Sequence, residues 1–183
     1  MIGDLLRKII YTIYGWQLPT VLIFACIMLI AWTLINRYLP GKLCKVFNYI
    51  VTAVIFTVIV FFTMSNRTVR TERPYRLIPF AHYFTSQSGI ETLWLNAFFF
   101  LPLGLSLPYI LPGKIKHKAT TTIMAALVFS TLIEAVQYIF ALGLCETDDV
   151  IMNTLGAAIG TMSYIACTKL SKVKDKNSLH NND

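Results

Sequence analysis

Two polar residues, Glu134 and Gln137, lie within a largely apolar stretch, STLIEAVQYIF at 130–140. Their spacing of three places both side chains on one side of a helix. A carboxylate inside a bilayer is costly, so it binds a proton, pairs with a cation or serves a function. Arg76 is the best candidate for the cation, because its long side chain is expected on the same side of the membrane. The alternative is a structural Arg–Glu clamp that binds no ligand.

A second group of polar residues follows shortly afterwards. Asp149 and Asn153 are four residues apart, and Gly156 and Gly160 continue the same stripe along a helix. A Gly-xxx-Gly pair lets two membrane helices approach closely, which favours hydrogen bonds between them. The glycines therefore predict helix packing, and Asn153 is either a ligand-binding residue or a hydrogen-bonding link between helices. Asp148 is expected to be a solvated loop charge.

A third stripe carries Asn96, Phe100 and Gly104 at intervals of four. Pro102 lies inside this stripe and removes one hydrogen bond of the helix, so a backbone carbonyl must find another partner. Asn96 has the same two interpretations as Asn153. Pro79, in the preceding polar segment, is expected to shape a surface or re-entrant loop.

The amino-acid composition predicts that these stripes lie in a membrane. Of the 183 residues, 56% are hydrophobic and only 14% are charged, whereas a soluble domain has about 25% charged residues. The apolar residues form blocks, which is typical of an integral membrane protein. The formal charge of +7 is carried between these blocks. We therefore expect no nucleic-acid partner.

Apolar blocks long enough to cross a bilayer predict an all-α, polytopic membrane protein with a compact bundle of about five transmembrane helices. The expected spans are 19–36, 46–65, 93–112, 119–144 and 150–168. Residues 1–18 have the apolar periodicity of an amphipathic interfacial helix. Residues 169–183 form a basic, polar tail that is expected to be disordered beyond its first turn. Residues 19–168 are thus the membrane domain, and a homo-oligomer is possible.

The distribution of basic residues predicts the orientation, because cytoplasmic loops are enriched in Lys and Arg. With five spans, one side carries Arg37, Lys42, Lys45, Lys114, Lys116, Lys118, Lys169, Lys172, Lys174 and Lys176. The other side carries the smaller set Arg7, Lys8, Arg67, Arg70, Arg73 and Arg76. This places the N-terminus outside and the C-terminus in the cytoplasm of a cell membrane. The polar stripes then meet at the outer leaflet.

Four ordered motifs between residues 76 and 160 resemble the VanZ-like family, whose members are small bacterial membrane proteins named for teicoplanin resistance. The motifs are RLIPF at 76–80, NAFFFLPLG at 96–104, IEAVQYIFALG at 133–143 and DDVIMNTLGAAIG at 148–160. The resemblance implies family positions at Arg76, Pro79, Phe80, Asn96, Phe100, Pro102, Gly104, Glu134, Gln137, Asp149, Asn153 and Gly156. Glu146 stands where the family pattern has an aspartate, and Arg73 is an alternative for the arginine of the first motif.

The resemblance implies reduced susceptibility to teicoplanin and related lipoglycopeptides. One hypothesis is that an outward-facing polar pocket binds a membrane lipid, a lipid-linked cell-wall precursor or the acylated antibiotic. Its ligand-binding residues would be Arg76, Asn96, Glu134, Gln137, Glu146, Asp149 and Asn153. No cofactor is expected. Transport is ranked last, because no internal repeat is visible.

The competing hypothesis is a membrane-embedded enzyme that modifies a lipid-linked substrate of the cell envelope. Glu134 or Asp149 would act as the general base, and Arg76 would stabilise developing negative charge. No Ser-His or Cys-His arrangement supports a nucleophile. A metal site with Glu134, Glu146, Asp149 and His82 as ligands is conceivable, but no ligand motif supports it, so no metal site is predicted.

Overall fold

The computed structural model describes residues 18–64, 69, 71–81 and 87–180 of the chain. The amphipathic helix predicted for residues 1–18 lies almost wholly outside the described residues, and so does His82. The elements are α2 (Leu18–Tyr38), α3 (Gly41–Met64), β1 (Tyr75–Arg76), α4 (Gln87–Ile110), α5 (Lys118–Ile139), β2 (Cys145–Glu146) and α6 (Thr147–His180). The prediction of an all-α bundle is therefore confirmed.

The helices have the lengths that a membrane requires. Within the described part of the chain, four helical segments are long and apolar enough to cross a bilayer: Gly41–Phe61, Leu93–Ile110, Lys118–Ile139 and Thr147–Lys169. Leu22–Tyr38 of α2 is a shorter apolar helix. These segments make the protein a multi-pass membrane protein.

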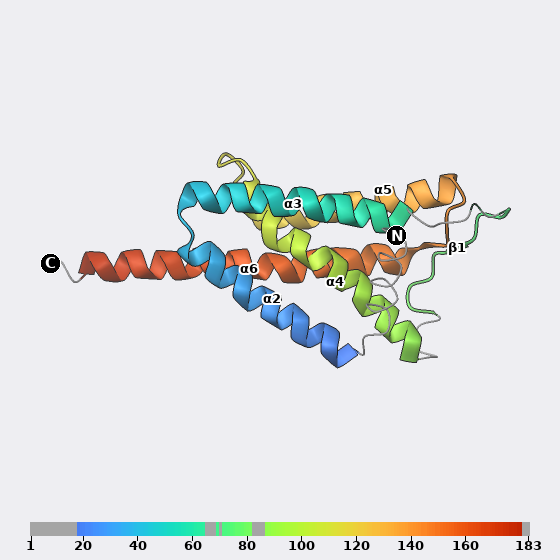
Figure 1. The fold of residues 1–183 in the computed structure, drawn as a ribbon, viewed down its shortest axis with the longest axis horizontal. Coiled ribbons are helices and arrows are strands. Elements are labelled where there is room, and N and C mark those ends of the chain that lie inside the picture. Colours follow the sequence, from blue (N-terminus) through green and yellow to red (C-terminus); the bar gives the residue numbers. More distant parts are fainter. Residues whose placement is uncertain (1–17, 65–68, 70, 82–86, 181–183) are drawn as a thin grey trace, which may run out of the picture.

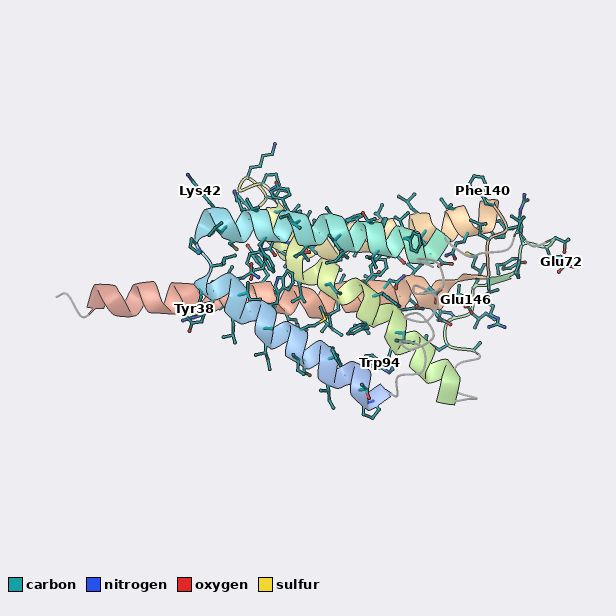
Figure 2. The ribbon with its side chains drawn as sticks, viewed as in Figure 1. Tyr38, Lys42, Glu72, Trp94, Phe140 and Glu146 are labelled. Carbon is teal, nitrogen blue, oxygen red and sulfur yellow. The ribbon has the colours of Figure 1, made fainter. Side chains whose placement is uncertain are left out.

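Successive helices run in opposite directions, so the bundle has two distinct ends (Figure 1). The basic end carries the turn between α2 and α3, the loop 111–117 and the C-terminal part of α6, which extends beyond the other helices. The opposite end carries β1 and β2. Figure 2 labels Tyr38 and Lys42 at the basic end and Glu72, Phe140 and Glu146 at the opposite end.

The most extensive helix contact joins α4 and α6, and glycines make it possible. A methyl group added at Gly156 would collide with the backbone carbonyl of Ala97, and one at Gly104 with the carbonyl of Ala157. A methyl group added at Gly160 would likewise collide with the carbonyl of Leu101. The two backbones therefore touch without intervening side chains, as small residues allow in membrane helices.

Beside this contact lies an apolar cluster. Phe100 is 2% exposed and packs with Ile133 of α5, Ala157 of α6 and Ile59 of α3. Pro102 lies inside α4, and its carbonyl oxygen accepts a hydrogen bond from the hydroxyl of Ser106 at 3.0 Å. Aromatic and aliphatic side chains thus join four helices around the middle of α4.

A polar network at the basic end was not predicted from the sequence. The side-chain amide of Asn48 donates hydrogen bonds to Asn36 Oδ1 at 2.6 Å and to the carbonyl of Cys44 at 2.7 Å. The hydroxyls of Thr33 and Ser163 are 2.6 Å apart and link α2 to α6. These contacts hold the α2–α3 hairpin against α6, in the way that polar side chains join membrane helices.

Two helix ends differ from the expected spans. α5 ends at Ile139, five residues before the predicted limit of 144. There, Leu142 N–H donates to the carbonyl of Gln137 and Ala141 N–H to that of Tyr138, with Ala141 in the left-handed region at φ 52°. This is a Schellman C-cap formed without glycine. At the other limit, α6 continues to His180, so the tail expected to be disordered is helical as far as that residue.

Candidate functional site

Residues 74–81, here called the strap, run along the end of the bundle opposite the basic end. β1 in the strap pairs in parallel with β2, so that Tyr75 lies opposite Cys145 and Arg76 opposite Glu146. The amide of Cys145 donates to the carbonyl of Pro74 at 3.1 Å. Two segments that are about 70 residues apart in sequence are thereby joined by backbone hydrogen bonds. We call this end the strap end.

The carboxylate of Glu134 on α5 binds the backbone of β2 and so stabilises this pairing. Its Oε2 accepts a hydrogen bond from the backbone N–H of Glu146 at 3.0 Å, and the residue is only 5% exposed. The guanidinium of Arg76 contacts Glu146 Oε1 at 3.2 Å, so Arg76 pairs with Glu146 and not with Glu134 as the sequence suggested. Because α5 ends at Ile139, Glu134 lies about one and a half turns from the end of its helix. It is nearer the strap than the expected span implied.

Asp148 has a role that the sequence analysis missed. It is 4% exposed, and its Oδ1 accepts the backbone N–H of Phe80 at 2.8 Å. The interpretation of Asp148 as a solvated loop charge is therefore wrong. Phe80 has φ 60°, and its ring packs against Leu93, Ala97 and Met152. The carboxylate of Asp148, in the first turn of α6, thus stabilises a strained turn of the strap. The position of this acidic residue at a helix N-terminus was the sequence signal for a role as a hydrogen-bond acceptor.

The amide side chains link the helices beneath the strap. Asn96 Nδ2 donates to Asp149 Oδ1 at 2.6 Å, which joins α4 to α6. Asn153 Nδ2 donates to the hydroxyl of Ser130 at 2.8 Å, which joins α6 to α5. Ser130 was not among the predicted residues.

The side chain of Gln137 donates to the carbonyl of Thr63 at 3.3 Å. That carbonyl belongs to the last turn of α3, where backbone acceptors have no partner within the helix. Gln137 therefore ties α5 to the end of α3. With these contacts, each predicted polar residue lies at the strap end, as the stripes in the sequence suggested.

The geometry separates two kinds of residue. The buried carboxylates and amides bond to neighbouring chain segments and hold the strap in place. The outer face of the strap is open: Tyr75, Leu77 and Ile78 are 62%, 63% and 76% exposed, and the side chain of Arg76 is 46% exposed. Residues that position the strap are thus distinct from residues that present a surface.

A shallow cavity of about 570 Å³ adjoins the strap. Val69 and Arg73 lie on one side of it, and Ile139 and Phe140 at the end of α5 lie on the other. It combines the guanidinium group of Arg73 and the hydroxyl of Thr71 with apolar side chains. Such a cavity suits a molecule that has both an anionic and an apolar part.

The thiol nearest to the carboxylates is Cys145. Burial raises the pKa of this thiol, and the negative charges of Glu134 and Asp149 raise it further. The thiol also lies within hydrogen-bonding reach of Glu134. Since the thiolate is the nucleophilic form, Cys145 is kept in its unreactive form at neutral pH. In the part of the chain that the structure describes, no three His, Cys, Asp or Glu side chains are placed to hold a metal ion.

This electrostatic arrangement gives a testable result. We expect Cys145 to be alkylated by iodoacetamide at pH 8 more slowly than a model peptide thiol, because a raised pKa lowers the thiolate fraction. In Glu134→Gln the rate should rise, since one neighbouring negative charge is lost. Peptide mapping by mass spectrometry reads the rate at this cysteine alone. An unchanged rate in the variant would contradict the proposed influence of Glu134 on the thiol.

Comparison with known families identifies the fold. The sequence model of the VanZ/LLP1 family matches residues 47–168. The chain belongs to the VanZ/LLP1 family. The predicted VanZ-like resemblance is thereby confirmed, and the matched range includes the strap and all of the polar residues described at the strap end. No curated protein and no solved structure matches the chain significantly.

Proposed function

We propose that this VanZ-type membrane protein lowers susceptibility to teicoplanin-like lipoglycopeptides by binding an amphiphile at the outer face of the strap. The observation that carries the proposal is the presence of Arg76 beside the exposed apolar side chains of Tyr75, Leu77 and Ile78. A guanidinium group recognises carboxylate or phosphate, and apolar side chains receive an acyl chain. Candidate ligands are the acylated antibiotic, a membrane lipid or a lipid-linked wall precursor.

The available hydrogen-bond donors support this role for Arg76. Its contact with Glu146 involves one nitrogen, whereas a guanidinium has five N–H donors. Arg73 lines the adjoining cavity together with Phe140 and adds a second basic group. An anionic head group at the strap would therefore meet two guanidinium groups next to an apolar surface.

Orientation is part of the proposal. The basic residues of the α2–α3 turn, the loop 111–117 and the C-terminal part of α6 all lie at the end opposite the strap (Figure 1). By the positive-inside rule, that end faces the cytoplasm and the strap faces outward. The strap would then lie on the side from which a glycopeptide antibiotic arrives, with the N-terminus outside and the C-terminus inside.

The competing hypothesis, a membrane-embedded enzyme, has less support. Glu134 and Asp149 accept hydrogen bonds from Glu146 N–H and from Asn96, contacts that hold chain segments together. The protonated state of Cys145 leaves this thiol a poor nucleophile. We therefore favour binding over catalysis.

A susceptibility assay with Arg76→Ala tests the proposal. We expect the wild-type chain to protect a sensitive Gram-positive host against teicoplanin more than against vancomycin, because only teicoplanin carries an acyl chain. Arg76→Ala should lose this protection at an equal membrane level, since a half-exposed ion pair contributes less than about 1 kcal/mol to stability.

The matched control is Arg37→Ala, which removes an exposed arginine at the basic end and should leave protection intact. Equal loss in both variants would show that total charge matters and not the strap. If the wild-type chain gives no protection against teicoplanin, the proposed function is wrong, whatever the variants do.

A further inference from the structure

Three helices enclose an apolar slot that shares no lining residue with the cavity at Arg73. Its volume is about 140 Å³, and it is lined by residues of α2, α4 and α6. The residues that shape it are Ala25, Cys26, Leu29, Ala97, Leu101 and Gly156. Trp94, labelled in Figure 2, lines it near the N-terminal end of α2.

The crossing of the helices explains why the slot exists. Near its C-terminal end, α2 is held to α6 by the Thr33–Ser163 hydrogen bond, and it diverges from α6 toward its N-terminal end (Figure 1). On the opposite wall, α4 and α6 touch at Ala97 and Gly156, so no large side chain fills the space between them. Small residues on both walls leave room that larger side chains would occupy.

We propose that the slot binds a single acyl or isoprenoid chain of a membrane lipid. The lining carries no charged side chain, and a thiol such as that of Cys26 behaves as a small hydrophobe. The slot lies between the shorter apolar helix α2 and two helices, α4 and α6, that are long enough to cross the bilayer, and it is open at its edge, since Cys26 is exposed. A volume of about 140 Å³ holds part of one chain but not a helix, which is about 10 Å wide.

The inner wall of the slot is buried, since Ala97 and Leu101 are 4% and 3% exposed, whereas Cys26 at its edge is exposed. A chain that enters the slot would therefore contact three helices at once. This distinguishes a bound lipid from the lipids that contact any single exposed helix. The inference does not rest on the proposed antibiotic phenotype.

Photo-crosslinking tests the proposal in proteoliposomes of phosphatidylethanolamine and phosphatidylglycerol. The vesicles contain the full chain and a trace of a phospholipid with a diazirine on its acyl chain, and adducts are located by peptide mapping. We expect several-fold more adduct on the α2 and α4 residues of the slot than on Ile50, Val54 and Val60. These three α3 residues are 60%, 55% and 44% exposed and report ordinary contact with lipid. Equal labelling of both faces would overturn the proposal.

A pair of variants on α2 sharpens the result. Ala25→Leu extends a side chain into the slot and should reduce slot adducts several-fold. Ile23→Leu changes a side chain that is 59% exposed and does not line the slot, so labelling should not change. Persistent adducts in Ala25→Leu would contradict the proposal. Protein–protein adducts at the slot, within the chain or between two copies, would show that a protein segment occupies it.

Discussion

Replacing Glu134 with alanine is expected to abolish protection against teicoplanin and to lower the free energy of unfolding by about 1–3 kcal/mol. The carboxylate of Glu134 accepts the N–H of Glu146 at 3.0 Å and is 5% exposed. Alanine would leave this N–H without its partner in a poorly hydrated place. The β1–β2 pairing would weaken, and with it the position of Arg76 opposite Glu146.

Glu134→Gln separates positioning from direct chemistry. Glutamine has nearly the same shape and keeps an oxygen that can accept the N–H of Glu146, but it carries no charge. If Glu134 positions the strap, the glutamine variant should retain most of the protection that the alanine variant loses. If Glu134 binds the ligand or a proton, both variants should lose protection. Stability is followed by thermal unfolding in detergent, and membrane levels are compared by an epitope tag.

The sequence was informative wherever spacing along one helix determines the outcome. The intervals between Glu134 and Gln137, and between Asp149 and Asn153, placed these side chains on common faces, and all four lie at the strap end. Apolar blocks predicted the helices for the same reason, since a span must satisfy its own backbone in lipid. The local periodicity of the sequence is sufficient to predict which residues share a helix face and where the apolar helices lie.

Contacts between distant segments could not be predicted in this way. The β1–β2 pairing joins two residues to two others across α4 and α5, and nothing in Tyr75–Arg76 or Cys145–Glu146 specifies the register. The partner of Arg76 follows from that register, so the choice of Glu146 over Glu134 was not visible in the sequence. Asp148 was misjudged because its acceptor role depends on where Phe80 lies.

The α4–α6 contact predicts the largest effect on folding. In Gly156→Ala, the added methyl group would meet the carbonyl of Ala97, which is backbone and cannot rotate away. The helices must separate, and we expect the free energy of unfolding to fall by about 3 kcal/mol, at the upper end of the range for overpacking. Gly156→Leu should give no folded protein. Unfolding of purified variants by SDS in mixed micelles measures these changes.

Gly113→Ala is the matched control, because a methyl group there meets nothing within 4 Å. Its free energy of unfolding should stay within about 0.5 kcal/mol of the wild-type value. A similarly small change in Gly156→Ala would mean that α4 and α6 do not touch as described. The Asn96–Asp149 hydrogen bond depends on the same approach of the two helices. Separation at Gly156 should therefore also release the support beneath the strap, so that folding and protection are lost together.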